Sequence, residues 1–175
     1  MITLLEHTSS SYGPRTYRNA AQGVTLAIAA DHNTAGERLT QKAAGEKIVL
    51  VDATKFADQW LDAARLLYLM LRKYDTRVVN VAGNGIYTLS KYDITQITMN
   101  DMVRRILFQV DQHLPLDKVV SGGQSGADLA GLIAAAKIGI PAEGMWPKSF
   151  KMRFQDGVDR AHTQQEVMDI INSYD

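Results

Sequence analysis

The chain has 175 residues, of which 46% are hydrophobic and 22% are charged, a composition that can form one folded core and does not suit a disordered chain. The 19 Lys and Arg residues balance the 19 Asp and Glu residues, so no overall field attracts nucleic acid or an anionic membrane. No cysteine is present, which excludes disulfides, thiolate catalysis and cysteine-ligated metal sites. We therefore expect a single domain, 1–175, without a nucleic-acid partner.

The apolar stretches are too short or too interrupted for a leader or a membrane span. The N-terminal apolar stretch is broken by Glu6 and His7 and lacks a basic flank and a cleavage site. The longest apolar run, Leu129 to Ile140, contains Lys137 and is shorter than the roughly 20 residues that cross a bilayer. We expect a cytoplasmic protein that makes no membrane contact.

Residues 1–23 predict an N-terminal arm or hairpin. The segment 9–23 is rich in Ser, Gly, Asn and Gln around Gly13-Pro14-Arg15, a composition typical of turns and loops. One hypothesis is that Arg15 and Arg18 reach across a subunit boundary from this arm.

After residue 23, short apolar runs alternate with stretches whose apolar residues recur every three or four positions. The runs predict strands and the stretches predict helices. In chain order we expect a strand at 24–30, a helix at 34–44, a strand at 47–51, a helix at 52–72, a strand at 77–81, a helix at 98–113, a strand at 118–121, a helix at 127–137, a short strand at 140–145 and a helix at 163–173. This alternation predicts an α/β, Rossmann-like three-layer fold: a mainly parallel sheet with helices on both faces, and a ligand site outside the carboxyl ends of its strands.

A glycine-rich turn connects the strand at 118–121 to the next helix. It has the sequence Ser121-Gly122-Gly123-Gln124-Ser125-Gly126-Ala127-Asp128. Glycines allow positive φ and close approach of a ligand, and the N–H groups that begin a helix favour a phosphate. The Ser125 hydroxyl can add a donor. The spacing matches neither GxGxxG nor Walker A, which argues against a P-loop NTPase. The alternative is a plain strand-to-helix turn in which the glycines only permit tight packing.

The same turn, with Gly139-Ile140-Pro141 after it, resembles the SGGQTGVD…GIP signature of the molybdenum-cofactor carrier proteins. It is also similar to the SGGARGID turn of DprA-type proteins. Both groups belong to the SLOG superfamily, whose Rossmann-like domains bind nucleotides and nucleotide-derived ligands. The resemblance continues through Met145-Trp146-Pro147-Lys148 and Gln155-Asp156-Gly157 and covers about the last hundred residues.

The resemblance implies positions for the ligand and for a candidate catalytic group. Gly122, Gly123, Gln124 and Gly126 would surround a ligand phosphate, and Asp128 would lie in the first turn of the following helix. Its carboxylate could accept hydrogen bonds from backbone N–H groups or a ribose hydroxyl, and it is the catalytic candidate if the protein is an enzyme. The alternative is a helix-start carboxylate that interacts with the helix dipole, worth about 0.3–1 kcal/mol. Because SLOG proteins are often dimers or tetramers, we also expect a homo-oligomer.

A second turn, Asn80-Val81-Ala82-Gly83-Asn84-Gly85, lies where SLOG proteins have their first glycine turn, but it lacks their usual Gly-Ser-Arg. The amides of Asn80 and Asn84 could read the edge of a base or ribose, because an amide offers both a donor and an acceptor. Equally, Asn-Gly is a strong turn dipeptide that needs no ligand.

Two further polar segments could reach the same sheet edge. Asp31-His32-Asn33 is followed by Glu37 and Arg38, of which Arg38 could bind a second phosphate. The segment 147–154 places Lys148 and two further cations between aromatic residues, which suits anion binding or a solvated lid. The four histidines are far apart and show no HxxxH or HExxH spacing, so no structural metal is expected.

The expected function is binding of a phosphate-containing, nucleotide-derived small ligand by a sensor, sequestering or carrier protein. One alternative is an enzyme of the nucleotide N-glycosidase or phosphoribohydrolase type, as in the LOG branch of SLOG. Another is a carrier of the molybdopterin cofactor, since that group shares the closest motif. A nucleotide or a molybdopterin-type ligand is therefore the candidate cofactor. Single-strand binding of the DprA type is disfavoured by the balanced charge.

Overall fold

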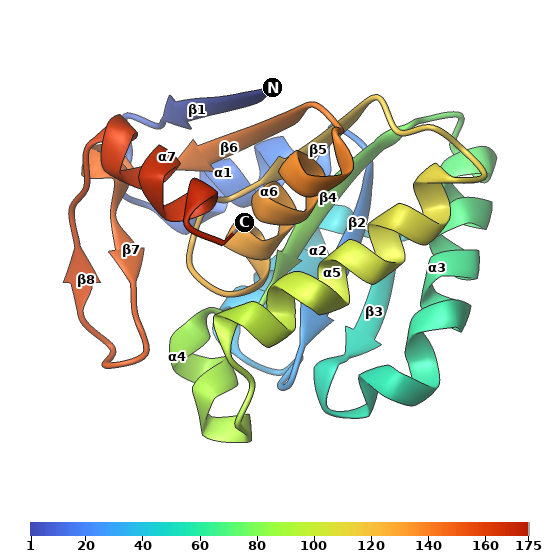
Figure 1. Cartoon of the computed structure of the whole chain (residues 1–175), viewed down its shortest axis with the longest axis horizontal. Helices are drawn as coiled ribbons and strands as arrows, with labels where there is room; N and C mark the ends of the chain where they lie inside the picture. The colour runs from blue at the N-terminus through green and yellow to red at the C-terminus, as the bar shows by residue number, and fades with distance from the viewer. Residues whose placement is uncertain (175) are drawn as a thin grey trace.

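Six parallel strands form one sheet in the computed structural model, which describes residues 1–174 (Figure 1). Their spatial order is β1-β6-β5-β4-β2-β3, and each neighbouring pair is parallel. In chain order the strands are β1 (Ile2–Glu6), β2 (Val24–Ala29), β3 (Ile48–Asp52), β4 (Val78–Gly83), β5 (Lys118–Ser121) and β6 (Ala142–Trp146).

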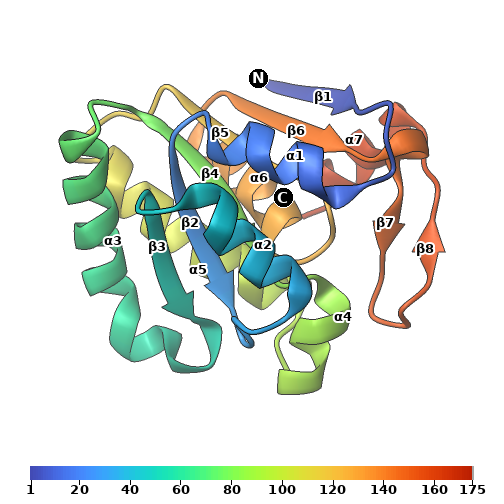
Figure 2. The same ribbon diagram turned by 180° about the vertical axis from the view of Figure 1, so that it is seen from behind.

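Helices cover both faces of this sheet. They are α1 (Tyr12–Ala20), α2 (Ala35–Ala44), α3 (Phe56–Lys73), α4 (Ile86–Leu89), α5 (Gln96–Asp111), α6 (Ala127–Ile138) and α7 (Gln164–Asn172), with 3-10 turns η1 (Ala53–Lys55), η2 (Ser90–Tyr92) and η3 (Lys148–Phe150). Figure 1 shows α3, α5, α6 and α7 over one face, and Figure 2 shows α1 and α2 over the other. The predicted three-layer Rossmann-like α/β fold is confirmed. No helix within residues 1–174 is both long and apolar enough to cross a bilayer.

The core forms because the central elements are apolar on every side. All six residues of β2 are buried, as expected for a parallel strand covered on both faces. Helix α6 is rich in alanine and lies directly on β4, where a Cβ at Gly131 would be 2.7 Å from the Cβ of Val81. This close packing fixes the start of α6, and with it the glycine-rich turn, relative to the carboxyl end of β4.

The strand order creates a crevice between β2 and β4. The chain passes from β2 outward to β3 and then crosses back to β4 on the other side of β2. Helix α2, which follows β2, covers one face, whereas the chain after β4 continues into α4 and then α5 on the other (Figures 1 and 2). Loops that diverge in this way at the carboxyl ends of parallel strands open a ligand crevice.

The N-terminal arm or hairpin predicted for 1–23 is wrong. Residues Ile2–Glu6 form β1, an edge strand that pairs in parallel with β6, and Tyr12–Ala20 form α1, which packs on α2. The turn-like composition was misleading because Pro14 lies in the first helical turn, where its missing N–H removes no intrahelical hydrogen bond.

A small antiparallel hairpin near the C-terminus was not predicted. It consists of β7 (Met152–Arg153) and β8 (Asp159–Arg160) and projects beside the carboxyl edge of the main sheet (Figure 1). Strands of two residues are too short to produce an alternating hydrophobic pattern.

Candidate functional site

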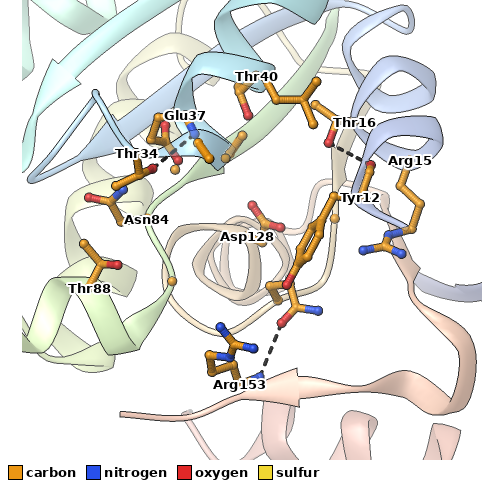
Figure 3. A pocket seen from close by; sticks show the side chains of 18 of the residues that line it. Tyr12, Arg15, Thr16, Thr34, Glu37, Thr40, Asn84, Thr88, Asp128 and Arg153 are labelled. Carbon is orange, nitrogen blue, oxygen red and sulfur yellow. Dashed lines mark hydrogen bonds between the residues drawn. The ribbon is translucent and has the colours of Figure 1, made fainter. Parts of the chain in front are cut away.

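A cavity of about 460 Å³ lies at the carboxyl ends of β4 and β5, in the crevice described above (Figure 3). This volume falls within the roughly 300–1,000 Å³ typical of small-molecule sites. Its walls come from five parts of the chain: α1 (12–19), the start of α2 (34–40), the end of β4 with α4 (80–88), the glycine-rich turn with the start of α6 (122–128), and Arg153 of β7.

Asn84 holds the two sides of the crevice together. Its side-chain carbonyl accepts hydrogen bonds from the backbone N–H groups of Ala30 and Asp31, both at 2.9 Å, and its amide donates to the Asp31 carbonyl at 3.0 Å. The side chain is buried, so these bonds are shielded from water. Asn84 therefore lines the cavity, while the polar atoms of its side chain are engaged by the loop after β2.

The glycines of the turn after β5 divide into two groups. Gly123 (φ +77°) and Gly126 (φ +88°) have positive φ, and an added Cβ would overlap the Trp146 ring or the Asn84 carbonyl oxygen, respectively. Both are needed for packing. The residues of this turn that line the cavity are Gly122, Gln124 and Ser125.

Three N–H groups of the turn are already engaged within the protein. The N–H of Gly123 donates to the Ser121 hydroxyl, that of Gly126 to the Gln96 side chain at 2.6 Å, and that of Ala127 to the Asn84 carbonyl at 3.1 Å. The Asp128 carboxyl group lies directly against Gly122 of the same turn. A carboxyl group of the protein itself therefore occupies part of the space in which a bound anion was expected.

Asp128 lies on the cavity wall in the first turn of α6, near the centre of Figure 3. A Cβ on Gly122 would collide with its Oδ2, so the carboxyl group lies directly against that glycine. Burial raises the pKa of Asp128 to about 7, although the Gln124 N–H and the charge of Arg15 act in the opposite direction. Near neutral pH this group can both donate and accept protons.

Glu37 is a second carboxyl group in the same cavity. Thr34 caps α2 by accepting from the Glu37 N–H at 3.2 Å, but the Glu37 carboxyl does not return a bond to Thr34. In α7, Glu166 occupies the equivalent position and completes the capping box by accepting from the Thr163 N–H at 2.7 Å.

The Glu37 side chain is instead buried at the cavity, and its Oε2 has no hydrogen-bond partner within residues 1–174. Burial raises the pKa of Glu37 to about 8, and the nearby charges of Asp128 and Asp31 raise it further. Without a ligand, the Glu37 side chain is therefore mainly a neutral carboxylic acid at neutral pH.

Two guanidinium groups line the cavity, those of Arg15 and Arg153 (Figure 3). Arg15 of α1 is buried and donates to the backbone carbonyls of Ser11 at 3.0 Å and Ser9 at 3.4 Å. Burial lowers its pKa, while Tyr12 and Asp128 raise it. Arg153 is exposed and forms a two-point ion pair with Asp159 at 2.9 and 3.0 Å.

Rings and hydroxyl groups complete the lining. Tyr12 and Tyr87 are exposed at the cavity, and the Arg15 guanidinium lies 5.2 Å from the centre of the Tyr12 ring. Asn80 is buried and donates to the Thr25 hydroxyl at 3.1 Å. Thr16, Thr34, Thr40 and Thr88 add hydroxyl groups to the wall.

The side chains of Gln124 and Ser125 hydrogen-bond the glycine-rich turn to the β7–β8 hairpin. The Gln124 amide donates to the Lys151 carbonyl at 2.9 Å and accepts from the Arg153 N–H at 3.3 Å, much as a neighbouring strand would. The Ser125 hydroxyl donates to the Arg153 carbonyl. The turn thereby determines where Arg153 stands.

Replacing Gln124 with Ala is expected to loosen the hairpin without unfolding the sheet, because both bonds are at the surface and link only these two segments. Amide hydrogen exchange should become faster across 151–160, while exchange in β4 and β5 stays unchanged. Unaltered exchange at 151–160 would show that Gln124 does not hold the hairpin.

The structure brings eight of the predicted ligand residues to the cavity and leaves five outside its lining. Those that line it are Asn80, Gly83, Asn84, Gly85, Gly122, Gln124, Ser125 and Asp128. Those that do not are Ser121, Gly123, Gly126, Arg38 and Lys148; Ser121 is fully buried, Arg38 donates to the Asn33 carbonyl, and Lys148 is exposed. Within residues 1–174 no three His, Asp or Glu side chains gather in an arrangement that could hold a metal ion.

Of the wall that α1 and α2 supply, the sequence placed only Glu37 near this sheet edge. The cavity residues that it missed there include Tyr12, Arg15, Thr16, Asn19, Thr34 and Thr40. The α1 residues were missed because the segment looked like a loop. No family model, no curated protein and no solved structure matches this chain. The likeness to SLOG proteins therefore rests on the motifs quoted from the sequence.

Proposed function

We propose that this protein binds a nucleotide-derived, phosphate-containing small ligand in the cavity between α1, α2 and the glycine-rich turn. The observation that carries the proposal is the pairing, in one cavity of about 460 Å³, of two carboxyl groups with two guanidinium groups. A nucleotide has matching chemistry, because its sugar hydroxyls are donors to carboxyl groups and its phosphate is an acceptor from guanidinium groups.

The phosphate subsite is assigned to Arg15 and Arg153 rather than to the N–H groups of the turn. Guanidinium groups bind phosphate through two parallel hydrogen bonds, and the N–H groups of Gly123, Gly126 and Ala127 in the turn already have partners. The exposed rings of Tyr12 and Tyr87 are suited to stack on a base. The resemblance of the turn to SLOG proteins supports the nucleotide class.

Native mass spectrometry of the purified protein tests this function. The expected result is an added mass that is released on denaturation and has the fragmentation pattern of a nucleotide derivative. If no such mass is retained, calorimetric titration with AMP and ADP-ribose tests whether the protein binds these nucleotides. Absence of heat with both probes would contradict the proposal for these ligands.

Replacing Arg153 with Ala is expected to weaken AMP binding by roughly ten- to a hundredfold, because a charge-assisted hydrogen bond to phosphate is lost. The matched control is Arg160→Ala on the same hairpin, since Arg160 also forms an exposed ion pair but lies outside the cavity lining. Calorimetry should give an unchanged Kd for the control. Equal losses of AMP affinity in both variants would contradict the assignment of Arg153 to the phosphate subsite.

A second candidate is an N-glycosidase-type enzyme, favoured by the two carboxyl groups whose pKa values burial raises toward neutrality, Asp128 to about 7 and Glu37 to about 8. Groups with such pKa values can act as a general acid and a general base at neutral pH. Chromatography for free base after incubation with nucleotides tests this activity. Under this reading Asp128→Asn abolishes turnover, and unchanged turnover in that variant would exclude Asp128 as the catalytic group.

The SLOG resemblance also supports a homo-oligomer. Light scattering of the purified protein is expected to give a mass of at least twice the 19.3 kDa of one chain. A mass of one chain at micromolar concentration would contradict this expectation.

A further inference from the structure

The cavity contains two carboxyl groups to which the protein supplies no cation. Within residues 1–174, neither Glu37 nor Asp128 takes part in an ion pair. The buried Arg15, whose charge acts on Asp128, uses its guanidinium group on backbone carbonyls instead. The buried Oε2 of Glu37 has no hydrogen-bond partner within residues 1–174. A buried carboxyl oxygen without a donor destabilises a fold, so Glu37 calls for a donor that arrives from outside.

The position of Glu37 in α2 does not force its carboxyl group into the cavity. The side chain could have capped α2 in the way that Glu166 caps α7, at the surface and with two hydrogen bonds. It lies instead at the cavity wall, where Asp128 also faces (Figure 3). Both carboxyl groups therefore border the same cavity, where one ligand can contact both.

The charges around the cavity determine what kind of donor fits. An ammonium group would be attracted by the carboxyl groups but repelled by Arg15 and Arg153, which line the same cavity. Neutral hydroxyl groups satisfy carboxyl groups without that repulsion, and adjacent hydroxyls can satisfy two carboxyl groups at once.

We propose that Glu37 and Asp128 together bind the 2′,3′-diol of a ribose, so that the cavity selects ribonucleotides over 2′-deoxyribonucleotides. This inference rests on the proposed function and adds the sugar class and its orientation. The diol faces α2 and the start of α6, and the phosphate faces the two arginines.

Calorimetric titration with four matched pairs of probes tests the selection: AMP, GMP, CMP and UMP, each against its 2′-deoxy counterpart. Wild-type protein is expected to bind at least one ribonucleotide roughly ten- to a hundredfold more tightly than its counterpart, because the deoxy compound leaves a buried carboxyl group unsatisfied. Glu37→Leu and Asp128→Ala should each reduce that ratio toward one. Glu37→Gln keeps an acceptor and should retain part of it.

Glu166→Leu is the matched control, since it removes the equivalent glutamate of α7, which lies outside the cavity lining, and should leave the ratio unchanged. Cooperative urea unfolding confirms that each variant is folded. Equal affinity of wild-type protein for both members of every pair would overturn the diol site while leaving the proposed function standing. A preference that survives Glu37→Leu and Asp128→Ala would also overturn it. If none of the eight probes binds, both the inference and the proposed function for mononucleotides fail.

Discussion

Glu37→Gln is expected to make the protein more stable at pH 8 than the wild type and to flatten the dependence of its stability on pH. In the folded state burial raises the pKa of Glu37 to about 8, whereas in the unfolded chain it should be near 4.5. Between these values the folded state holds a proton that the unfolded state has released. The contribution of Glu37 to the free energy of unfolding is therefore largest below about pH 4.5 and falls as the pH rises toward 8.

The size of the effect follows from the linkage between proton binding and folding. Each unit of difference in pKa corresponds to about 1.4 kcal/mol, so ionising Glu37 in the folded state costs on the order of 5 kcal/mol. Asp128, whose pKa burial raises to about 7, adds a change of the same sign over a lower range of pH. Glutamine preserves the size of the neutral acid and carries no proton linkage.

Urea unfolding of the wild type and Glu37→Gln at pH 5, 6, 7 and 8 measures this difference. Glu166→Gln is the control, because the Thr163 backbone N–H lowers the pKa of Glu166 and its contribution changes only in acid. The free energies of wild type and Glu37→Gln should diverge as the pH rises. Parallel curves for the two proteins would mean that Glu37 is not buried as described.

Asn84→Ala is expected to destabilise the fold by about 3 kcal/mol and to abolish ligand binding. The substitution removes the acceptor for two backbone N–H groups and the donor to one carbonyl, all in the loop after β2. Each buried backbone group left without a partner costs roughly 1–3 kcal/mol. Without this link the loop after β2 is no longer fixed to the end of β4, and the crevice loses its shape.

Asn80→Ala provides the comparison, because Asn80 is equally buried, lies on β4 just before Asn84, and donates a single hydrogen bond, to the Thr25 hydroxyl. Its expected loss is about 1 kcal/mol. Chemical denaturation of both variants, with AMP titration of the folded forms, gives the two quantities. Similar losses for Asn80→Ala and Asn84→Ala would show that the three bonds of Asn84 do not hold the crevice.

The sequence predicted the sheet and its helices well because their signals are local. The β-branched run at 24–30 and the three- and four-residue spacing across 52–72 reflect burial on both faces of a strand and on one face of a helix. The structure places β2 at 24–29 and α3 at 56–73. Parallel pairing then follows from the alternation of strands and helices.

The cavity could be predicted only in part, because its wall joins distant segments. The turns after β4 and β5 were recognisable from their glycines and asparagines. The part that α1 supplies was not, since Arg15 lies in a polar segment whose helix depends on packing against α2. Glu37 was recognised in a polar segment that could reach this sheet edge, and only the structure shows that its carboxyl group is buried at the cavity.

The role of the glycine-rich turn also depended on three-dimensional contacts. Its glycines predicted a loop that binds phosphate through its backbone N–H groups. In the structure, Gly123 and Gly126 are needed for close packing against Trp146 and Asn84. The sequence alone could not show that Asp128 would fold back against Gly122.

The measurement that tests the central claim most directly is an NMR titration of ¹⁵N-labelled protein with AMP and with ADP-ribose. Binding in the proposed cavity predicts that the shifted amide signals cluster at 12–19, 34–40, 83–88 and 122–128 and at Arg153, while signals from α3 and β3 stay in place. Shifts concentrated elsewhere, or none at millimolar ligand, would contradict a nucleotide site in this cavity.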